Sequence, residues 1–242
     1  MDGTIAGSTV AVVLAAGSGE RLGWGVPKAL VPLRGRPMLQ YSLELLGACE
    51  PIAATIVVVP ELALGDIAAL VDELSPSIKV QALVPGGATR QESVRRGLEA
   101  VDPRTDSVLC HDAARPLATT ELFNKVLRGL EGAEGCVPVV PSPDTVKLVR
   151  DGRVTRTIPR AEIGLAQTPQ AFSFSVLRES HRRALREGLE ATDDATLVEV
   201  AGHTVAAVEG EISNFKITTP EDLRRAEQIL AEKSELVEGS HQ

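Results

Sequence analysis

Aromatic side chains and cysteines are scarce in this chain of 242 residues. Phe, Trp and Tyr make up only 2% of the sequence, although 43% of its residues are hydrophobic, so a core must be built mainly from Val, Leu, Ile and Ala. The three cysteines, Cys49, Cys110 and Cys136, are an odd number, lie far apart and have no metal-type spacing. They argue against a disulfide framework or a zinc site and favour a reducing compartment, the cytoplasm.

An excess of positive charge and long apolar runs are also missing. The net charge of −8 argues against general binding to nucleic acid or to an anionic membrane. No apolar run approaches the roughly 18 residues that a membrane helix needs, and no Lys or Arg precedes the first apolar run, so we expect no signal peptide. An anionic ligand would therefore need a local basic cluster.

Short apolar runs alternate with amphipathic segments along most of the chain. This alternation predicts an α/β fold with a doubly wound, mostly parallel, Rossmann-like sheet that binds ligands at the carboxyl ends of its strands. We expect a single domain over 1–242 with a disordered tail over 234–242. The segments expected as strands are 10–14, 55–59, 79–84, 107–110, 135–139, 204–208 and 214–217, and those expected as helices are 38–48, 63–74, 91–101, 119–130, 174–187, 194–200 and a last helix beginning at Thr219-Pro220.

The loop after the first apolar run is the strongest candidate site. Ala15–Gly19 has almost no side chains, so its backbone N–H groups can approach a phosphate closely. Arg21 and Lys28 follow on the same loop. Glycines alone would fit an ordinary strand-to-helix turn, but two added cations favour a polyphosphate site. A Walker A motif is absent, and the dinucleotide fingerprint lacks its acid at the expected distance.

A projecting arm is predicted over about 141–165. Pro141-Ser-Pro143 cannot continue a central strand, and two β-prone runs then flank Asp151-Gly152, which is a strong hairpin signal. An isolated hairpin needs a surface to pack on, and a second subunit would supply one, although a solvated hairpin is the simpler alternative.

Polar clusters follow several other predicted strands. Asp112 is a candidate ligand for Mg²⁺ or a ribose hydroxyl, or else an ion-pair partner of Arg115. We expect His111, at the end of an apolar run, to be structural. Thr192-Asp193-Asp194 could bind a ligand or only cap a helix, and Lys216 alone would be an edge charge.

Taken together, the motifs resemble one family. The motifs that carry the resemblance are Leu14–Lys28, His111–Pro116, Asp144–Lys147, Thr168–Phe172, Thr192–Asp194 and Asn214–Leu223. From about Thr9 to Glu232 the chain is similar to the 2-C-methyl-D-erythritol 4-phosphate cytidylyltransferase family of the non-mevalonate isoprenoid pathway. It departs from the family pattern at Ala29, where many members have glutamine, and at Ala88, where an acid is common.

The resemblance implies an enzyme that transfers a cytidylyl group from CTP to 2-C-methyl-D-erythritol 4-phosphate. The products would be 4-diphosphocytidyl-2-C-methyl-D-erythritol and pyrophosphate, with Mg²⁺ or another divalent cation as cofactor and a homodimer formed through the arm. Two alternatives remain at this point. One is the same chemistry on ribitol 5-phosphate, and the other is a non-catalytic or dinucleotide-binding Rossmann-like protein.

The resemblance also implies roles for individual residues. Arg21 and Lys28 would stabilise the transition state and the departing pyrophosphate, and Asp112 would contact a metal held mainly by the CTP phosphates. The residues implied to bind CTP are Ala15, Ala16, Gly17, Gly87, Ser93, Asp112 and Ala113. The residues implied to bind and aim the polyol phosphate are Thr145, Arg160, Thr192 and Lys216, and Arg160 and Lys216 are implied to be catalytic together with Arg21 and Lys28.

Overall fold

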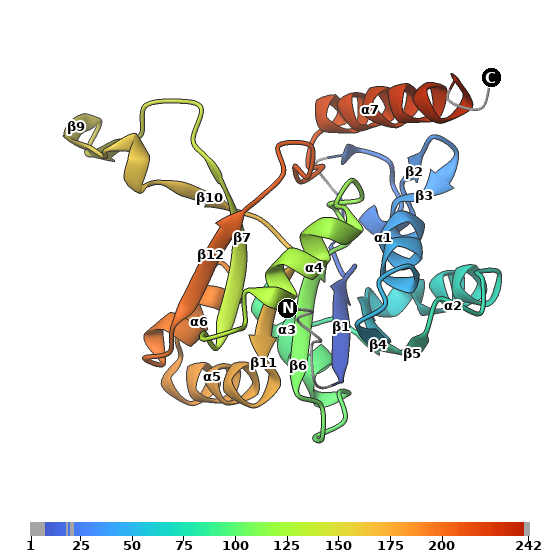
Figure 1. The fold of residues 1–242 in the computed structure, drawn as a ribbon, viewed down its shortest axis with the longest axis horizontal. Coiled ribbons are helices and arrows are strands. Elements are labelled where there is room, and N and C mark those ends of the chain that lie inside the picture. The colour runs from blue at the N-terminus through green and yellow to red at the C-terminus, as the bar shows by residue number, and fades with distance from the viewer. Residues whose placement is uncertain (1–7, 18, 20–21, 240–242) are drawn as a thin grey trace.

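A mostly parallel sheet of eight strands forms the centre of the molecule (Figure 1). The computed structural model describes residues 8–17, 19 and 22–239, with side chains up to residue 234. The strands run in the order β10-β7-β11-β6-β1-β4-β5, with β12 beside β7. Their bounds are β1 Thr9–Leu14, β4 Ile52–Val59, β5 Val80–Pro85, β6 Ser107–Asp112, β7 Gly135–Pro141, β10 Gly164–Ala166, β11 Gln170–Ser173 and β12 Val205–Glu209.

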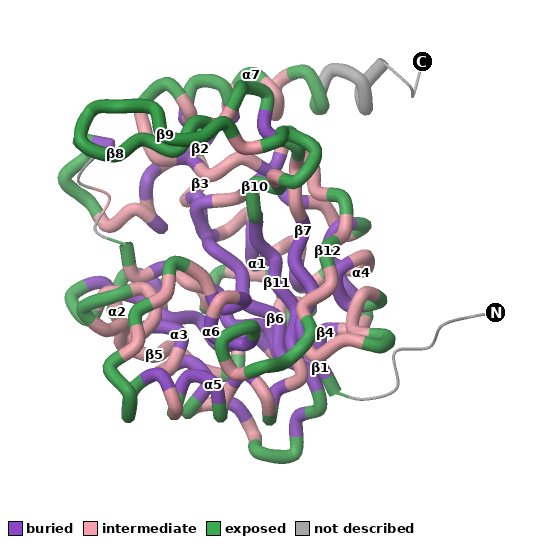
Figure 2. The backbone as a smooth tube through the Cα atoms, turned by 90° about the vertical axis from the view of Figure 1, so that its left-hand side faces the viewer, coloured by how far each residue is buried: buried purple, intermediate pink, exposed green. Residues whose placement is uncertain are grey.

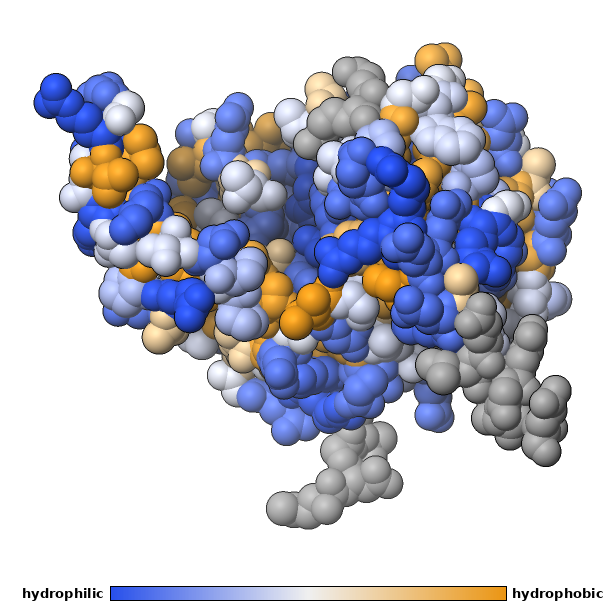
Figure 3. All heavy atoms as spheres, turned by 90° about the horizontal axis from the view of Figure 1, so that it is seen from above, coloured by the Kyte–Doolittle hydropathy of each residue, from blue (hydrophilic) through white to orange (hydrophobic). Residues whose placement is uncertain are grey.

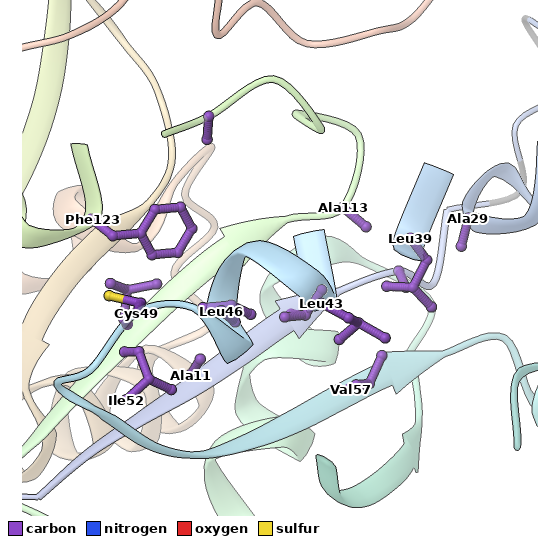
Figure 4. Packing of buried hydrophobic residues seen from close by; sticks show 14 of the residues in the cluster. Ala11, Ala29, Leu39, Leu43, Leu46, Cys49, Ile52, Val57, Ala113 and Phe123 are labelled. Carbon is purple, nitrogen blue, oxygen red and sulfur yellow. The ribbon is translucent and has the colours of Figure 1, made fainter. Parts of the chain in front are cut away.

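Helices cover both faces of this sheet. Their bounds are α1 Met38–Gly47, α2 Leu64–Asp72, α3 Arg90–Glu99, α4 Thr120–Arg128, α5 Phe174–Glu187, α6 Asp194–Val200 and α7 Pro220–Gly239. Apolar side chains of α1, α2 and α4 pack on one face, part of which Figure 4 shows, and those of α3, α5 and α6 pack on the other. The helix α7 packs with the small β2–β3 hairpin (Pro32–Leu33 and Arg36–Pro37).

The central strand β1 shows why these residues form a buried parallel strand. Ala11 and Val13 point into one apolar cluster while Val10 and Val12 point into the other. All four are 5% exposed or less, so the strand has no solvent face that would require polar residues. Figure 2 shows the central strands buried, in contrast with the exposed arm.

The expected fold class is confirmed, but three local expectations need correction. The strand β11 was not predicted; it lies antiparallel between β6 and β7. No strand forms over 214–217; this segment is irregular instead. The helix α7 continues to Gly239, although a disordered tail was expected from residue 234, and residues 240–242 lie outside the described residues.

The predicted arm is present and projects from the edge of the sheet (Figure 1). Its tip is the hairpin of β8 (Lys147–Arg150) and β9 (Arg153–Thr157), and it returns to the sheet through β10, which pairs with β7. Asp151 and Gly152 both have positive φ, +49° and +73°, as a tight type I′ turn requires. The sequence signal for this turn is therefore explained by its backbone geometry.

Candidate active site

A cleft of about 620 Å³ lies where β1, β5 and β6 end. The loops that follow these strands line it, as expected for the carboxyl edge of a doubly wound sheet. Its described lining includes three cations, Lys28, Arg90 and Lys216, and a single carboxylate, Asp112. This local excess of positive charge lies within a chain of net charge −8, so the cleft is suited to an anionic ligand.

The loop after β1 brings Lys28 against the glycine-rich turn. The backbone N–H of Lys28 donates to the carbonyl of Gly17 at 3.3 Å. A Cβ at Gly19 would lie only 3.1 Å from the Lys28 Cα, and Gly19 also has a φ of +74°. Both the close approach and the backbone conformation require glycine here. The turn therefore fixes the start of the lysine side chain at the cleft.

The loop between β5 and α3 approaches the same turn. A Cβ at Gly86 would collide with the Cβ of Ala16 at 2.4 Å, so only glycine allows the two loops to meet. Thr89 caps α3 by accepting from the backbone N–H of Glu92 at 3.0 Å. The Ser93 hydroxyl accepts from the Gly87 N–H at 3.0 Å and donates to the Thr89 carbonyl at 2.9 Å. These bonds set the shape of the cleft wall.

Asp112, at the end of β6, is held between two cations. Its Oδ1 accepts from Arg90 Nε at 3.2 Å and its Oδ2 from Lys216 Nζ at 2.6 Å. Burial raises the pKa of Asp112, but the charges of Arg90 and Lys216 outweigh burial and hold the pKa well below its ordinary value. Asp112 is thus ionised at neutral pH, and the two cations are fixed relative to it.

Buried amide contacts hold the segment that carries Lys216. The fully buried Asn214 donates to the Thr168 carbonyl at 2.9 Å and to Gln167 Oε1 at 3.3 Å. The Ile217 N–H donates to the Ala114 carbonyl at 2.8 Å. The side-chain amide bonds of Asn214 and this one backbone bond therefore replace the strand pairing that was expected over 214–217.

Arg115 and His111 lie beside the site. Arg115 donates to the Asn214 carbonyl at 2.7 Å, so it braces the Lys216 segment, and the ion-pair partners of Asp112 are Arg90 and Lys216 instead. His111 is fully buried, its Nδ1 lies 3.3 Å from Thr168 Oγ1, and burial lowers its pKa to about 4. Its ring is neutral at pH 7 and packs on Phe123, which agrees with the structural role expected from the sequence.

Most of the residues singled out in the sequence meet at this cleft. Those that line it are Ala15, Ala16, Gly17, Lys28, Gly87, Ser93, Asp112, Ala113 and Lys216, together with the two departures, Ala29 and Ala88. Thr145 and Arg160 lie on the exposed arm instead, and Thr192 is exposed ahead of α6, where Asp193 makes the cap. Arg21 lies outside the described residues. Sequence reasoning gave Arg90 no role, although it lies between Gly87 and Ser93, both of which the resemblance implies to bind CTP.

A divalent cation fits the donor set in one specific way. Magnesium in nucleotide sites is bound by one or two carboxylates together with substrate phosphates rather than by a cage of protein ligands. Asp112 supplies one ionised carboxylate at the cleft, and no group of three or more His, Cys, Asp or Glu side chains in the described ranges could hold a metal alone. The described residues therefore offer a metal one carboxylate, which also accepts from Arg90 and Lys216, and would leave its other ligands to a bound substrate.

One physical exclusion concerns membranes. Across residues 8–17, 19 and 22–239, no helix combines the length and the apolar character that crossing a bilayer requires.

Comparisons with known proteins identify the family. The model of the family described as 2-C-methyl-D-erythritol 4-phosphate cytidylyltransferase matches residues 9–232. A protein of that name from Syntrophotalea carbinolica is 40% identical over 224 residues, covering 92% of this chain and 96% of its own length. A bifunctional enzyme IspD/IspF from a Bradyrhizobium species is 43% identical over 231 residues; the match covers 94% of this chain but 58% of that longer protein.

Solved structures give the same result. The 4-diphosphocytidyl-2C-methyl-D-erythritol synthase of Anaerococcus prevotii superimposes with a TM-score of 0.83 at 32% identity, covering 93% of this chain and 99% of that one. The 2-C-methyl-D-erythritol 4-phosphate cytidylyltransferase of Thermus thermophilus superimposes with a TM-score of 0.74 at 38% identity, covering 91% and 98%. The resemblance seen in the sequence is confirmed, and the chain belongs to the 2-C-methyl-D-erythritol 4-phosphate cytidylyltransferase family, a family of nucleotidyltransferases.

Proposed function

We propose that this chain transfers a cytidylyl group from CTP to 2-C-methyl-D-erythritol 4-phosphate, releasing pyrophosphate. The observation that carries this proposal is the cationic cleft at the carboxyl ends of β1, β5 and β6, where Lys28, Arg90 and Lys216 surround Asp112, the one carboxylate of its described lining. Family membership indicates which nucleotide and which polyol phosphate are the substrates, and the cleft has the positive charge that two phosphorylated substrates need.

The chemistry needs no general base. The nucleophile is a phosphate oxygen of the polyol phosphate, which is already largely dianionic at neutral pH because the second pKa of a phosphomonoester is about 6. It forms a bond to the α-phosphorus of CTP while the bond from that phosphorus to the bridging oxygen of pyrophosphate breaks. The burial and lowered pKa of His111 agree with a reaction that uses no histidine.

The residues of the cleft would then act by position and charge. Lys28, with Arg21 from the same loop, would neutralise the negative charge that develops on the α-phosphate and on the leaving pyrophosphate. Backbone N–H groups of Ala15–Gly17 and the Gly87–Ser93 wall would hold the nucleotide. Lys216, fixed against Asp112 at 2.6 Å, would face the phosphate of the second substrate. Holding two anions in line supplies most of such a rate enhancement.

We also propose a requirement for Mg²⁺ or another divalent cation. Asp112 is the protein carboxylate that would contact it, and the CTP phosphates would supply most of the remaining oxygen ligands. A bound divalent cation supplies charge neutralisation on the phosphates of the nucleotide.

Pyrophosphate release tests the activity. The purified chain is given each of the four nucleoside triphosphates with 2-C-methyl-D-erythritol 4-phosphate or with ribitol 5-phosphate, in the presence and absence of Mg²⁺. We expect release with CTP and the methylerythritol phosphate only. Release with the ribitol phosphate alone would assign the related activity. No release, combined with calorimetric binding of NAD instead of CTP, would indicate a dinucleotide-binding protein.

A homodimer formed through the arm is a further part of the proposal. Leu148, Val149 and Val154 on the hairpin and Leu165 on β10 are between 43% and 62% exposed, and Figure 3 shows apolar side chains on the arm where it stands away from the body. A second copy of the chain would cover them, and would bring Thr145 and Arg160 to the neighbouring cleft. The three free, buried cysteines fit a reducing cytoplasm, in which we place the enzyme.

A further inference from the structure

Behind the cleft lies a buried acid and histidine pair that the proposed reaction does not use. Asp194, the first residue of α6, is 1% exposed, and His181 on α5 is 2% exposed. His181 Nε2 lies 3.0 Å from Asp194 Oδ1. Neither residue lines the cleft. A carboxylate removed from water at this depth is costly unless it is paired, so its partners show what it does.

The second partner of Asp194 is Arg90 of the cleft wall. Arg90 NH1 lies 2.9 Å from Asp194 Oδ2, while Arg90 Nε donates to Asp112 Oδ1 at 3.2 Å. One planar guanidinium therefore bridges a carboxylate at the cleft and a carboxylate behind it. Lysine is a single point charge and could not reproduce both contacts in a fixed plane.

Capping of α6 does not account for Asp194. That role belongs to Asp193, whose Oδ1 accepts from the Thr196 N–H at 3.0 Å and from the Thr196 hydroxyl at 2.6 Å. Burial raises the pKa of Asp194, but the charge of Arg90 and the hydrogen bond from His181 outweigh burial and keep the pKa below its ordinary value. Asp194 is thus a charged group, and one of its two partners, Arg90, lines the cleft.

We propose that His181 and Asp194 are positioning residues: His181 orients the carboxylate of Asp194, which fixes the guanidinium of Arg90, and Arg90 in turn fixes Asp112 at the cleft. The relay runs from α5 through α6 and α3 to the end of β6, and its most distant members, Arg90 and Asp194, are 104 positions apart in the sequence. Its effect on catalysis rests on the proposed function, because it assumes that the charges at the cleft face phosphorylated substrates. Its effect on Arg90 does not depend on that assumption.

The first measurement uses the protein without substrates. In a ¹⁵N–¹H spectrum, the Nε–H signal of Arg90 is assigned by its loss in Arg90→Lys, and its exchange with water is measured. Asp194→Asn and His181→Leu are each expected to speed this exchange about tenfold or more. The matched control is Ser180→Ala: Ser180 is a buried neighbour of His181 on α5 whose hydroxyl has no hydrogen-bond partner among the described residues, so exchange at Arg90 should be unchanged.

The second measurement separates positioning from folding. With CTP and 2-C-methyl-D-erythritol 4-phosphate, His181→Leu is expected to raise the KM values about tenfold, at the low end of the tenfold to hundredfold effects known for groups that orient a functional side chain. His181→Gln, whose amide N–H can still reach Asp194, should restore most of the loss. A merely structural defect would reduce the amount of folded enzyme, and so the apparent kcat, but would leave KM unchanged.

The outcomes are distinct. Unchanged KM and unchanged exchange at Arg90 in Asp194→Asn and His181→Leu would overturn the relay, whatever their melting temperatures. If Asp194→Asn does not fold, the comparison of His181→Leu with His181→Gln decides. If the wild-type chain has no cytidylyltransferase activity and exchange at Arg90 still responds as expected, the positioning of Arg90 is supported and the proposed function is the part that fails.

Discussion

The cleft and the arm both carry charged side chains, but Asp112 in the cleft is buried and ion-paired, whereas Arg160 on the arm is exposed. Asp112 in the cleft is 6% exposed and is fixed between Arg90 and Lys216. Arg160 on the arm is exposed and donates to the Pro143 carbonyl at 3.1 Å, and every residue of β8 and β9 is exposed. The described charges of the cleft are therefore fixed by one another within one chain, whereas the hairpin of the arm has no buried residue to fix its side chains.

Removing the lysine of the cleft should produce the largest effect. We expect Lys28→Ala to lower turnover by about 10² to 10³, the usual value of a preorganised charge at a phosphoryl transition state. The melting temperature should stay nearly unchanged, because the Lys28 side chain is half-buried at the cleft and is not part of the apolar core. Steady-state kinetics and thermal unfolding check both expectations.

Lys79→Ala is the matched control for that experiment. Lys79 is exposed and precedes β5, so it lies at the opposite edge of the sheet from the cleft. Its removal should leave turnover intact. Near-normal turnover in Lys28→Ala would remove Lys28 from the proposed site.

A mixed dimer tests whether the arm works on its neighbour. Lys28→Ala and Arg160→Ala homodimers should each be nearly inactive. In a mixed dimer one site collects both lesions and the other has neither, so random reassortment of equal amounts should restore roughly a quarter of wild-type activity in a two-fold dimer. If Arg160 acts within its own chain, every site carries a lesion and no activity returns. Mass spectrometry confirms that the subunits have exchanged.

Replacing His111 tests whether this buried residue beside the cleft contributes to folding or to the reaction. Its pKa in the folded chain is lowered from 6.5 to about 4, so the unfolded chain binds the proton more readily. The contribution of His111 to the free energy of unfolding is therefore fully present above pH 6.5. It is lost as the pH drops toward 4, by up to about 3 kcal/mol. His111→Asn should lower the free energy of unfolding near pH 7.5 by about 1 to 3 kcal/mol and remove this pH dependence.

Urea unfolding at several pH values measures that change, and a pH–rate profile accompanies it. The profile of His111→Asn should keep the shape of the wild-type profile. Loss of a limb near neutral pH would instead make His111 an acid or base in the reaction.

The smallest effect on folding is expected at the arm. Val154 is 62% exposed, so Val154→Ser should change the free energy of unfolding by less than about 0.5 kcal/mol when measured on dissociated subunits. Sedimentation velocity should show weaker self-association, because an apolar contact is lost from the proposed interface. Unaltered association would move the interface away from this part of the hairpin.

Local chemistry made much of the fold predictable. The run Val10–Leu14 is a central strand because apolar residues on both of its faces suit a strand buried on both sides. Strand-end positions such as Gly87 and Asp112 were predicted to gather because parallel strands end at one edge. The segment 214–217 was mispredicted because its β propensity is local, whereas the bonds of Asn214 to Gln167 and Thr168 are not.

What the sequence alone determined is the set of elements whose signals are local, including the Asp151-Gly152 turn with its two positive φ angles. Which charges act together, by contrast, depends on the three-dimensional fold. Arg90 looks like an ordinary residue at a helix start, and its partners Asp112 and Asp194 lie 22 and 104 positions away along the chain. Coulomb energy and desolvation depend on distance and burial in space, so no spacing along the chain could have shown that these groups form one network.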